Sequence, residues 1–149
     1  MESLQTMWSS RKQGAPVATP KQGTRVAPVP TTKARGDAAE DAALLHLQRQ
    51  GLKLVQRNFK TPGRGGGEID LIMREPDGTL VFIEVRQRAS QRQGGAGASI
   101  TPLKQRRIVF AARHFLLRLG SEPACRFDVV LIDGSSGQID WLRAAFDAS

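Results

Sequence analysis

The stretch GEIDLIMREPDGTLVFIEVRQR, residues 67–88, decides the fold. Two segments rich in Ile, Leu, Val and Phe, residues 68–74 and 79–86, flank the turn sequence EPDG at 75–78. Apolar, β-branched segments on either side of an Asp-Gly turn are typical of a β-hairpin. The sequence therefore predicts two antiparallel strands joined by a short loop.

Two carboxylates interrupt these strands. Asp70 lies within GEIDLIM and Glu84 within VFIEVR, and a three-residue loop at 76–78 would place them opposite each other on one face of the hairpin. Carboxylates about 5 Å apart repel each other unless a cation lies between them, and Mg²⁺ or Mn²⁺ suits such oxygen ligands. Taken singly, Asp70 could instead pair with Arg86, and Glu84 could face water at a strand edge.

The segments around the hairpin predict a mixed α/β domain. Asp37 is a suitable N-cap for a helix over 38–50, in which helical spacing puts Glu40 on the apolar face. A second helix is predicted from the Thr101–Pro102 pair to Gly120. The remaining strands are predicted at 52–59, 126–132 and, as a short edge strand, 138–142. The order is α-β-β-β-α-β-β, with both helices packed on one sheet.

Charge and composition divide the chain into a basic arm and a folded domain. Residues 1–34 contain four of the eight prolines and no apolar periodicity, which predicts a disordered arm before a domain over 35–149. Residues 1–35 hold six Lys and Arg against one acid, a net charge of +5. Between Glu84 and Glu122 there are eight basic residues and no acid. This distribution indicates a polyanion partner, although a solvated basic face would explain it equally well.

Composition also excludes several classes of protein. With one cysteine, Cys125, and two histidines, the chain has neither an intramolecular disulfide nor a Cys-rich zinc site. Its apolar runs are far shorter than the ~20 residues that span a bilayer, and its start lacks the layout of a secretory signal. We therefore expect a soluble, cytoplasmic protein with no membrane partner. The loop at 61–67 lacks the Gly-Lys-Ser/Thr ending of an ATP-binding loop.

Six segments carry a resemblance to a known family: GDAAEDAALLHLQRQG, QRNF, GEIDLIM, LVFIEVRQR, TPLKQRRI and RFDVVLID. Over residues 36–146 they resemble the YraN-type family of small uncharacterised proteins, with the arm as an extension lacking a counterpart. That family is similar to the PD-(D/E)XK nuclease superfamily, which includes archaeal Holliday-junction resolvases. The resemblance implies a restriction-endonuclease-like mixed sheet flanked by helices.

The resemblance also assigns site residues. It implies that Glu40, Asp70 and Glu84, with the backbone carbonyl of Val85, bind Mg²⁺ or Mn²⁺ for attack on a phosphodiester. We expect the three carboxylates to meet in one pocket at an edge of the sheet. Arg86 stands where the nucleases have the lysine of Glu-x-Lys. Arginine cannot act as a general base, but it can donate two hydrogen bonds to a phosphate.

The second predicted helix supplies candidate nucleic-acid-binding residues. They are Lys104, Arg106, Arg107 and Arg113. Contacts from such residues to phosphates would be independent of sequence and weakened by salt. The alternative is that these side chains only solvate the outer face of the helix.

Three functions remain open from the sequence. The first is a metal-dependent endonuclease that acts on DNA rather than RNA, with branched structures as possible substrates and Asp70, Glu84 and Arg86 as catalytic residues. The second is a nucleic-acid-binding module whose nuclease site is degenerate at Arg86. The third is a scaffold whose basic arm contacts an acidic partner or ribosomal RNA. The sequence does not determine the oligomeric state.

Overall fold

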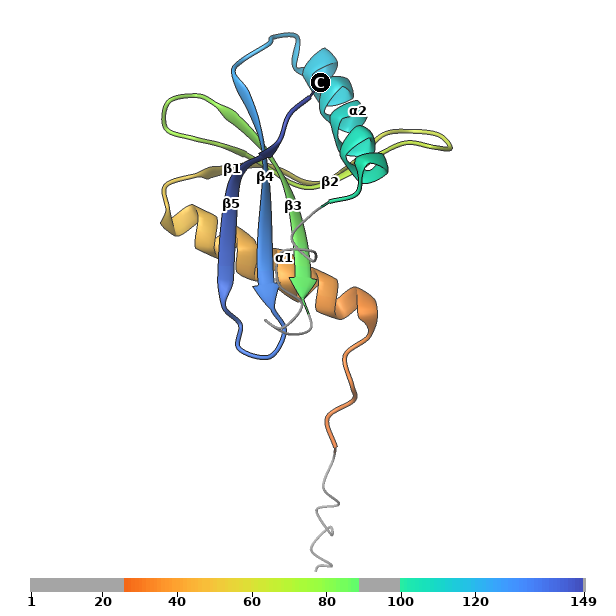
Figure 1. Cartoon of the computed structure of the whole chain (residues 1–149), viewed down its shortest axis with the longest axis vertical. Coiled ribbons are helices and arrows are strands. Elements are labelled where there is room, and N and C mark those ends of the chain that lie inside the picture. Colours follow the sequence, from red (N-terminus) through yellow and green to blue (C-terminus); the bar gives the residue numbers. More distant parts are fainter. Residues whose placement is uncertain (1–25, 89–99, 149) are drawn as a thin grey trace, which may run out of the picture.

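A computed structural model of the chain describes residues 26–88 and 100–148. Its elements follow the predicted order α-β-β-β-α-β-β and form one five-stranded sheet (Figure 1). Their bounds are α1 (Thr32–Arg49), β1 (Lys53–Lys60), β2 (Glu68–Arg74), β3 (Leu80–Arg88), α2 (Pro102–Leu119), β4 (Cys125–Asp133) and β5 (Ile139–Phe146).

The sheet is mixed because α2 connects two parallel strands. The strands lie in the order β1-β2-β3-β4-β5. β3 and β4 are parallel, and the other neighbouring pairs are antiparallel. Parallel neighbours need a long crossover, which α2 provides. This confirms the predicted fold class and leaves β2 and β3 as interior strands.

The register of the β2–β3 hairpin is the predicted one. Leu71 lies opposite Ile83 and Arg74 opposite Leu80, and the backbone N–H of Glu75 donates to the carbonyl of Thr79 at 2.9 Å. The loop therefore contains three residues, 76–78. Extended by one residue, this register puts Asp70 opposite Glu84.

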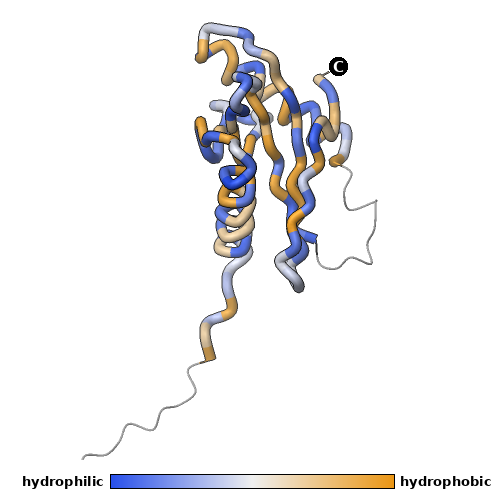
Figure 2. Tube along the Cα trace, turned by 90° about the vertical axis from the view of Figure 1, so that its left-hand side faces the viewer, coloured by the Kyte–Doolittle hydropathy of each residue, from blue (hydrophilic) through white to orange (hydrophobic). Residues whose placement is uncertain are grey.

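Each face of the sheet carries one helix and one apolar cluster. On the α1 face, Ala39, Ala43 and Leu47 pack against residues of β2, β3 and β4, and apolar positions run along these strands beside the helix in Figure 2. On the α2 face, the ring of Phe115 meets the edge of Phe59 with centroids 5.5 Å apart. Two covered faces explain why β3 is buried from Leu80 through Glu84.

The first helix begins earlier than predicted. Its N-cap is Thr31, whose side-chain oxygen accepts a hydrogen bond from the backbone N–H of Ala34 at 3.1 Å, so Asp37 lies inside the helix. Thr31 supplies the capping oxygen that was expected of Asp37, and the helix runs through Gly36 although glycine in a helix interior costs about 1 kcal/mol. Residues 32–34, assigned to the arm, are therefore helical. Residues 1–25 of the predicted arm lie outside the described residues.

The last strand is longer than predicted. β5 extends to Phe146, four residues beyond the predicted end at 142, and Ala144 has a φ of 49° where the β4–β5 register shifts. The extra residues of this bulge allow β5 to continue beyond residue 142, which the sequence pattern does not predict. Trp141 is partly buried against the α1-side cluster.

The loop between β1 and β2 lies against α2. A Cβ on Gly67 would stand 1.9 Å from the backbone carbonyl oxygen of Arg107. The backbone N–H of Gly67 donates to the Thr61 hydroxyl at 2.8 Å. Only glycine permits this approach, which holds the start of β2 close to α2.

Candidate active site

Asp70 and Glu84 meet where β2 and β3 separate. Their last paired residues are Leu71 and Ile83, although both strands continue. Beyond that pair, Oδ2 of Asp70 accepts a hydrogen bond from the backbone N–H of Val85 at 2.8 Å, and the carboxyl groups of Asp70 and Glu84 interact directly. The pair thus lies at a fork between two interior strands, not at an edge of the sheet as expected. The β2–β3 hairpin is flanked by β1 and β4, which is why the expected edge position is wrong.

Burial perturbs both acids of this pair. Glu84 is 8% exposed and Asp70 is half-buried. Burial, followed by the negative charge of Glu84, raises the pKa of Asp70 to about 7, against the opposing hydrogen bond from Val85. Burial also raises the pKa of Glu84, against the opposing charge of Lys104. At neutral pH, a cation at this position would relieve the repulsion between the two carboxylates.

Two basic side chains lie next to the pair. Lys104, in the first turn of α2, holds its Nζ 3.5 Å from Oε1 of Glu84. This orientation follows from the Thr101 cap, whose hydroxyl accepts from the backbone N–H of Lys104 at 3.2 Å. Arg86 is two residues beyond Glu84 on β3, and its charge also acts to lower the pKa of Glu84. The other carboxylate oxygen of Glu84, Oε2, is buried without a hydrogen-bond partner.

Glu40 approaches the pair from α1. Burial, followed by the charge of Asp70, raises the pKa of Glu40, so the two acids are electrostatic neighbours. Its Oε2 is 3.6 Å from Nη2 of Arg57 and has no hydrogen-bond partner. Arg57 is engaged more closely by Asp41, at 2.7 Å. Asp70 therefore interacts with both of the other predicted ligands, Glu84 and Glu40.

The acids are of the type that binds a divalent cation, but they are not arranged as a complete set of ligands. Across residues 26–88 and 100–148, no group of three or more His, Cys, Asp or Glu side chains is arranged to hold a metal ion. Two interacting carboxylates and the unpartnered oxygens of Glu84 and Glu40 are the donors that a hard divalent cation prefers. The Asp70–Glu84 pair fits such a cation. Metal ligation by Asp70, Glu84, Glu40 and the Val85 carbonyl stays a prediction.

The four basic residues predicted to bind nucleic acid do not share one side of α2. At 3.6 residues per turn, Arg107 lies within about a quarter turn of Lys104, whereas Arg106 and Arg113 lie about half a turn away. Arg106 and Arg113 instead border a groove with Val109, Phe110 and the C-terminal tail. The structure thus brings Lys104 to the acid pair and directs Arg106 and Arg113 away from it.

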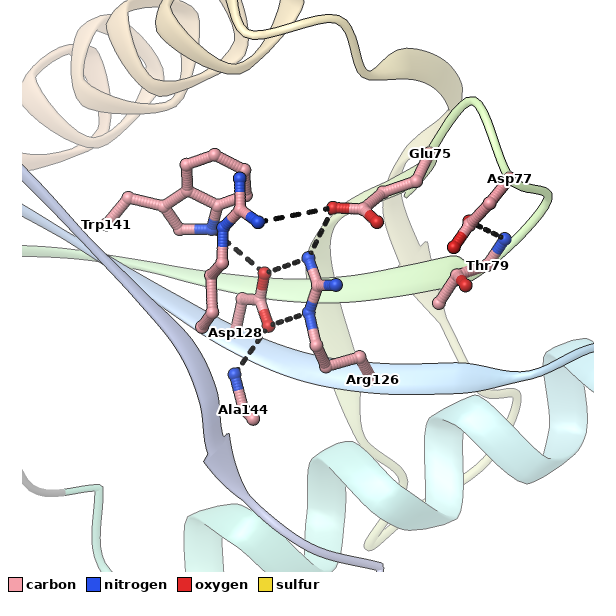
Figure 3. Close-up of polar contacts among 8 residues, drawn as sticks. Glu75, Asp77, Thr79, Arg126, Asp128, Trp141 and Ala144 are labelled. Atoms are coloured by element: carbon pink, nitrogen blue, oxygen red, sulfur yellow. Dashed lines mark hydrogen bonds and ion pairs between the residues drawn. The ribbon is translucent and has the colours of Figure 1, made fainter.

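A further buried acid, Asp128, was missed by the sequence analysis (Figure 3). It is fully buried in β4. It accepts hydrogen bonds from Arg126 at 2.9 and 3.0 Å, from the indole N–H of Trp141 at 2.9 Å and from the backbone N–H of Ala144 at 2.9 Å. Arg126 also donates to Glu75 at 2.9 Å. Its hydrogen bonds to Trp141 and Ala144 join β4 to β5. An acid within the apolar segment RFDVVLID was the sequence signal that could have identified it.

Comparison with known proteins places this chain in a family. The profile described as "Uncharacterised protein family UPF0102" matches residues 39–132. The chain belongs to the UPF0102 family. This confirms the YraN-type resemblance, and the matched region contains Glu40, Asp70, Glu84 and α2.

Relatives within UPF0102 cover most of the chain. The UPF0102 protein of Polaromonas sp. (strain JS666) is 60% identical over 151 residues, which are 96% of this chain and 100% of that protein. The UPF0102 protein of Albidiferax ferrireducens is 66% identical over 120 residues, 80% of this chain and 92% of that protein. The Polaromonas alignment extends into residues 1–34, so the expectation that the arm has no counterpart is wrong.

One solved structure shows a distant likeness. The structure titled "Crystal structure of SSO0001" is 15% identical with a TM-score of 0.37, covering 82% of this chain and 55% of that chain. At this level the likeness says nothing about function. No helix in the part of the chain that the structure describes is long and apolar enough to cross a membrane.

Proposed function

We propose that this UPF0102 protein is a metal-dependent phosphodiesterase that cleaves DNA, with branched structures among its substrates. The observation that carries the proposal is the Asp70–Glu84 pair, in which burial and mutual repulsion raise the pKa of Asp70 to about 7. Burying interacting carboxylates costs several kcal/mol without compensating charge, and the ammonium of Lys104 lies near only one oxygen of Glu84, Oε1. Unlike Asp128, Glu84 keeps a buried oxygen without a donor. This pair is therefore more readily explained by a ligand than by folding.

Each residue of the site has a role in this proposal. Asp70 and Glu84 would hold Mg²⁺ or Mn²⁺, with Glu40 and the Val85 carbonyl as further ligands; the bound cation would supply Lewis-acid activation of the phosphodiester. Arg86 stays protonated and would bind the phosphate oxygens. Lys104, now 3.5 Å from Glu84, would provide a second positive charge beside the reacting phosphate.

The basic side chains around the fork would bind the nucleic-acid backbone. Lys104 and Arg107 lie on the side of α2 nearer the acid pair, and the 61–67 loop beside Arg107 carries the exposed Arg64. Contacts of this kind bind phosphates without reading sequence. They suit an enzyme that recognises the shape of its substrate.

One observation favours a second function, a nucleic-acid-binding module without turnover. Arg86 occupies the lysine position of Glu-x-Lys, and a guanidinium cannot take up a proton from water. The module would keep phosphate binding and would have lost cleavage.

The decisive experiment uses the purified full chain with labelled duplex, flap and four-way DNA over a range of Mn²⁺ and Mg²⁺ concentrations. Asp70→Asn is the test variant. Asp77→Asn, the same substitution in the exposed turn of the same hairpin, is the control. The proposal expects metal-dependent cleavage that Asp70→Asn abolishes and Asp77→Asn preserves. Binding without cleavage would support the second function, and the absence of both would overturn the two proposals together.

A further inference from the structure

The outer face of α2 carries an uncovered apolar row. Leu103, Phe110 and Leu117 are spaced seven residues apart, so they lie on one side of the helix. They are 51%, 46% and 79% exposed, respectively. The inner face already packs on the sheet through Ile108, Phe115 and other residues. The outer row therefore takes no part in the core.

Basic side chains frame this row on both sides. Arg106 and Arg113 lie along one side and Arg107 lies along the other. Arg118 starts on the same side as Arg107, but its guanidinium lies over the ring of Phe59, 5.9 Å from the centroid. Helix α2 (Pro102–Leu119) contains no acidic residue. Its outer face is thus apolar along the middle and positively charged at both margins.

Two hollows adjoin the row. One is lined by Arg106, Val109, Phe110 and the tail residue Asp147. The other is lined by Arg113, Leu117 and, beyond the end of the helix, residues that include the acid Glu122. A surface with an apolar row beside hollows can accept the side chains of a docked helix.

We infer that the outer face of α2 docks an acidic amphipathic helix of a partner protein. The apolar face of such a helix would cover Leu103, Phe110 and Leu117, and its acidic flanks would meet the arginines. A second copy of α2 fits less well. Paired antiparallel about Phe110, it would set Arg113 opposite Arg107 of the other copy, with no acid on either helix.

Nucleic acid would match the charge of this face but not its apolar row, because the three exposed apolar side chains would meet phosphates. The row also lies away from the acid pair, since Lys104 turns to the other side of α2. The docking inference shares only Arg107 with the nuclease proposal, which places that residue on the DNA-binding side of α2. It gives Arg106 and Arg113 a role distinct from that of Lys104.

The test measures binding of the full chain to a labelled synthetic helix of about 20 residues, with leucines along one face and glutamates flanking them. A second peptide replaces each glutamate with lysine. Leu117→Ser is the test variant, and Leu45→Ser, at a 49% exposed leucine on α1, is the control. We expect the acidic peptide to bind, Leu117→Ser to weaken it about tenfold, and Leu45→Ser to leave it unchanged.

Four outcomes would overturn the inference. They are equal binding of both peptides, an equal effect of the two leucine variants, failure of the acidic peptide to bind, and concentration-dependent dimerisation that Leu117→Ser abolishes. Vesicles containing anionic lipid are tested in parallel. Binding to vesicles that is lost in Leu117→Ser, without peptide binding, would assign the face to a membrane surface instead.

Discussion

Buried carboxylates of the same chemical type have opposite roles in this sheet. Asp128 accepts four hydrogen bonds from Arg126, Trp141 and the backbone. Asp70 accepts one from the backbone of Val85 and is repelled by Glu84. A satisfied carboxylate stabilises the fold, whereas a repelled one destabilises it until a cation binds. This contrast predicts opposite effects of the same substitution.

Asp70→Asn should leave the free energy of unfolding unchanged or raise it when no metal is present. The folded pKa of Asp70 is raised from 3.8 to about 7, so its contribution to stability is fully present below pH 4 and is lost as the pH rises through 7. In Asp70→Asn the neutral amide does not ionise, so the variant does not lose stability as the pH rises. Chemical denaturation in EDTA at several pH values should show the gain over wild type growing from pH 4 to above pH 7. A large loss of stability would instead make Asp70 a structural ion-pair partner.

Asp128→Asn should destabilise the protein by about 3–5 kcal/mol, because it replaces a fully buried carboxylate, paired with the half-buried Arg126, by a neutral amide with one accepting oxygen for four donors. Urea denaturation near neutral pH measures the change. Asp77→Asn, in the exposed hairpin turn, controls for the substitution itself. If Asp128→Asn lowered the free energy of unfolding no more than Asp77→Asn does, Asp128 would not join β4 to β5.

Arg86→Lys should raise phosphodiester cleavage, because it restores a compact ammonium and leaves more room beside Glu84. Arg86→Ala should lower both cleavage and DNA binding, since it removes charge-assisted hydrogen bonds that contribute about 1.5–3 kcal/mol. Single-turnover cleavage and equilibrium binding separate the two effects. If wild type cleaves and lysine slows it, arginine is the working residue. If neither variant changes binding or cleavage, Arg86 has no part in the site.

At the scale of elements, the acid pair depends on how the β1–β2 loop and α2 hold the start of β2. Gly67 contacts the α2 backbone so closely that no side chain fits. Thr101 caps α2 and sets Lys104 towards Glu84. The contact of Gly67 with α2 and the Thr101 cap therefore set how close the first turn of α2 lies to the acid pair.

Two glycine substitutions test this arrangement. Gly67→Ala should destabilise the fold by about 1–3 kcal/mol, because its Cβ would overlap the carbonyl of Arg107. Gly36→Ala, which has open space inside α1, should stabilise it by about 0.5–1 kcal/mol. Thermal and urea unfolding measure both. Equal effects would show that the loop does not rest against α2.

At the scale of the whole molecule, two basic surfaces of the described residues differ in what accompanies their charge. The fork combines Arg86 and Lys104 with the buried acid Glu84. The outer face of α2 combines arginines with an apolar row, and the helix carries no acid. The proposed catalytic and docking functions therefore occupy different sides of one small domain.

Deleting residues 1–25 should weaken DNA binding without changing the melting temperature. These residues carry four Lys and Arg and one acid, a net charge of +3, and have no apolar pattern with which to join the core. If all three excess charges meet phosphates, the slope of log K against log salt should fall by about 3. Binding titrations at several salt concentrations measure the slope. An unchanged slope would show that this segment does not contact DNA.

Features that depend on local periodicity could be predicted from the sequence alone. Turn chemistry and alternation predicted the hairpin register, and the Thr101–Pro102 cap and Gly120 predicted both ends of α2. The start of α1 was misplaced because Asp is at least as favourable an N-cap as Thr, so local preference does not select Thr31, where the helix begins.

Which acids have hydrogen-bond donors and which repel each other is known only from the packed fold. Asp70, Glu84 and Asp128 all interrupt apolar strands, so the sequence pattern treats them alike. Whether a buried carboxylate is satisfied depends on donors far along the chain, such as Trp141 for Asp128. The same holds for α2, where the separation of Lys104 from Arg106 and Arg113 is known only once one face of the helix packs on the sheet. Long-range packing, not local pattern, sets both outcomes.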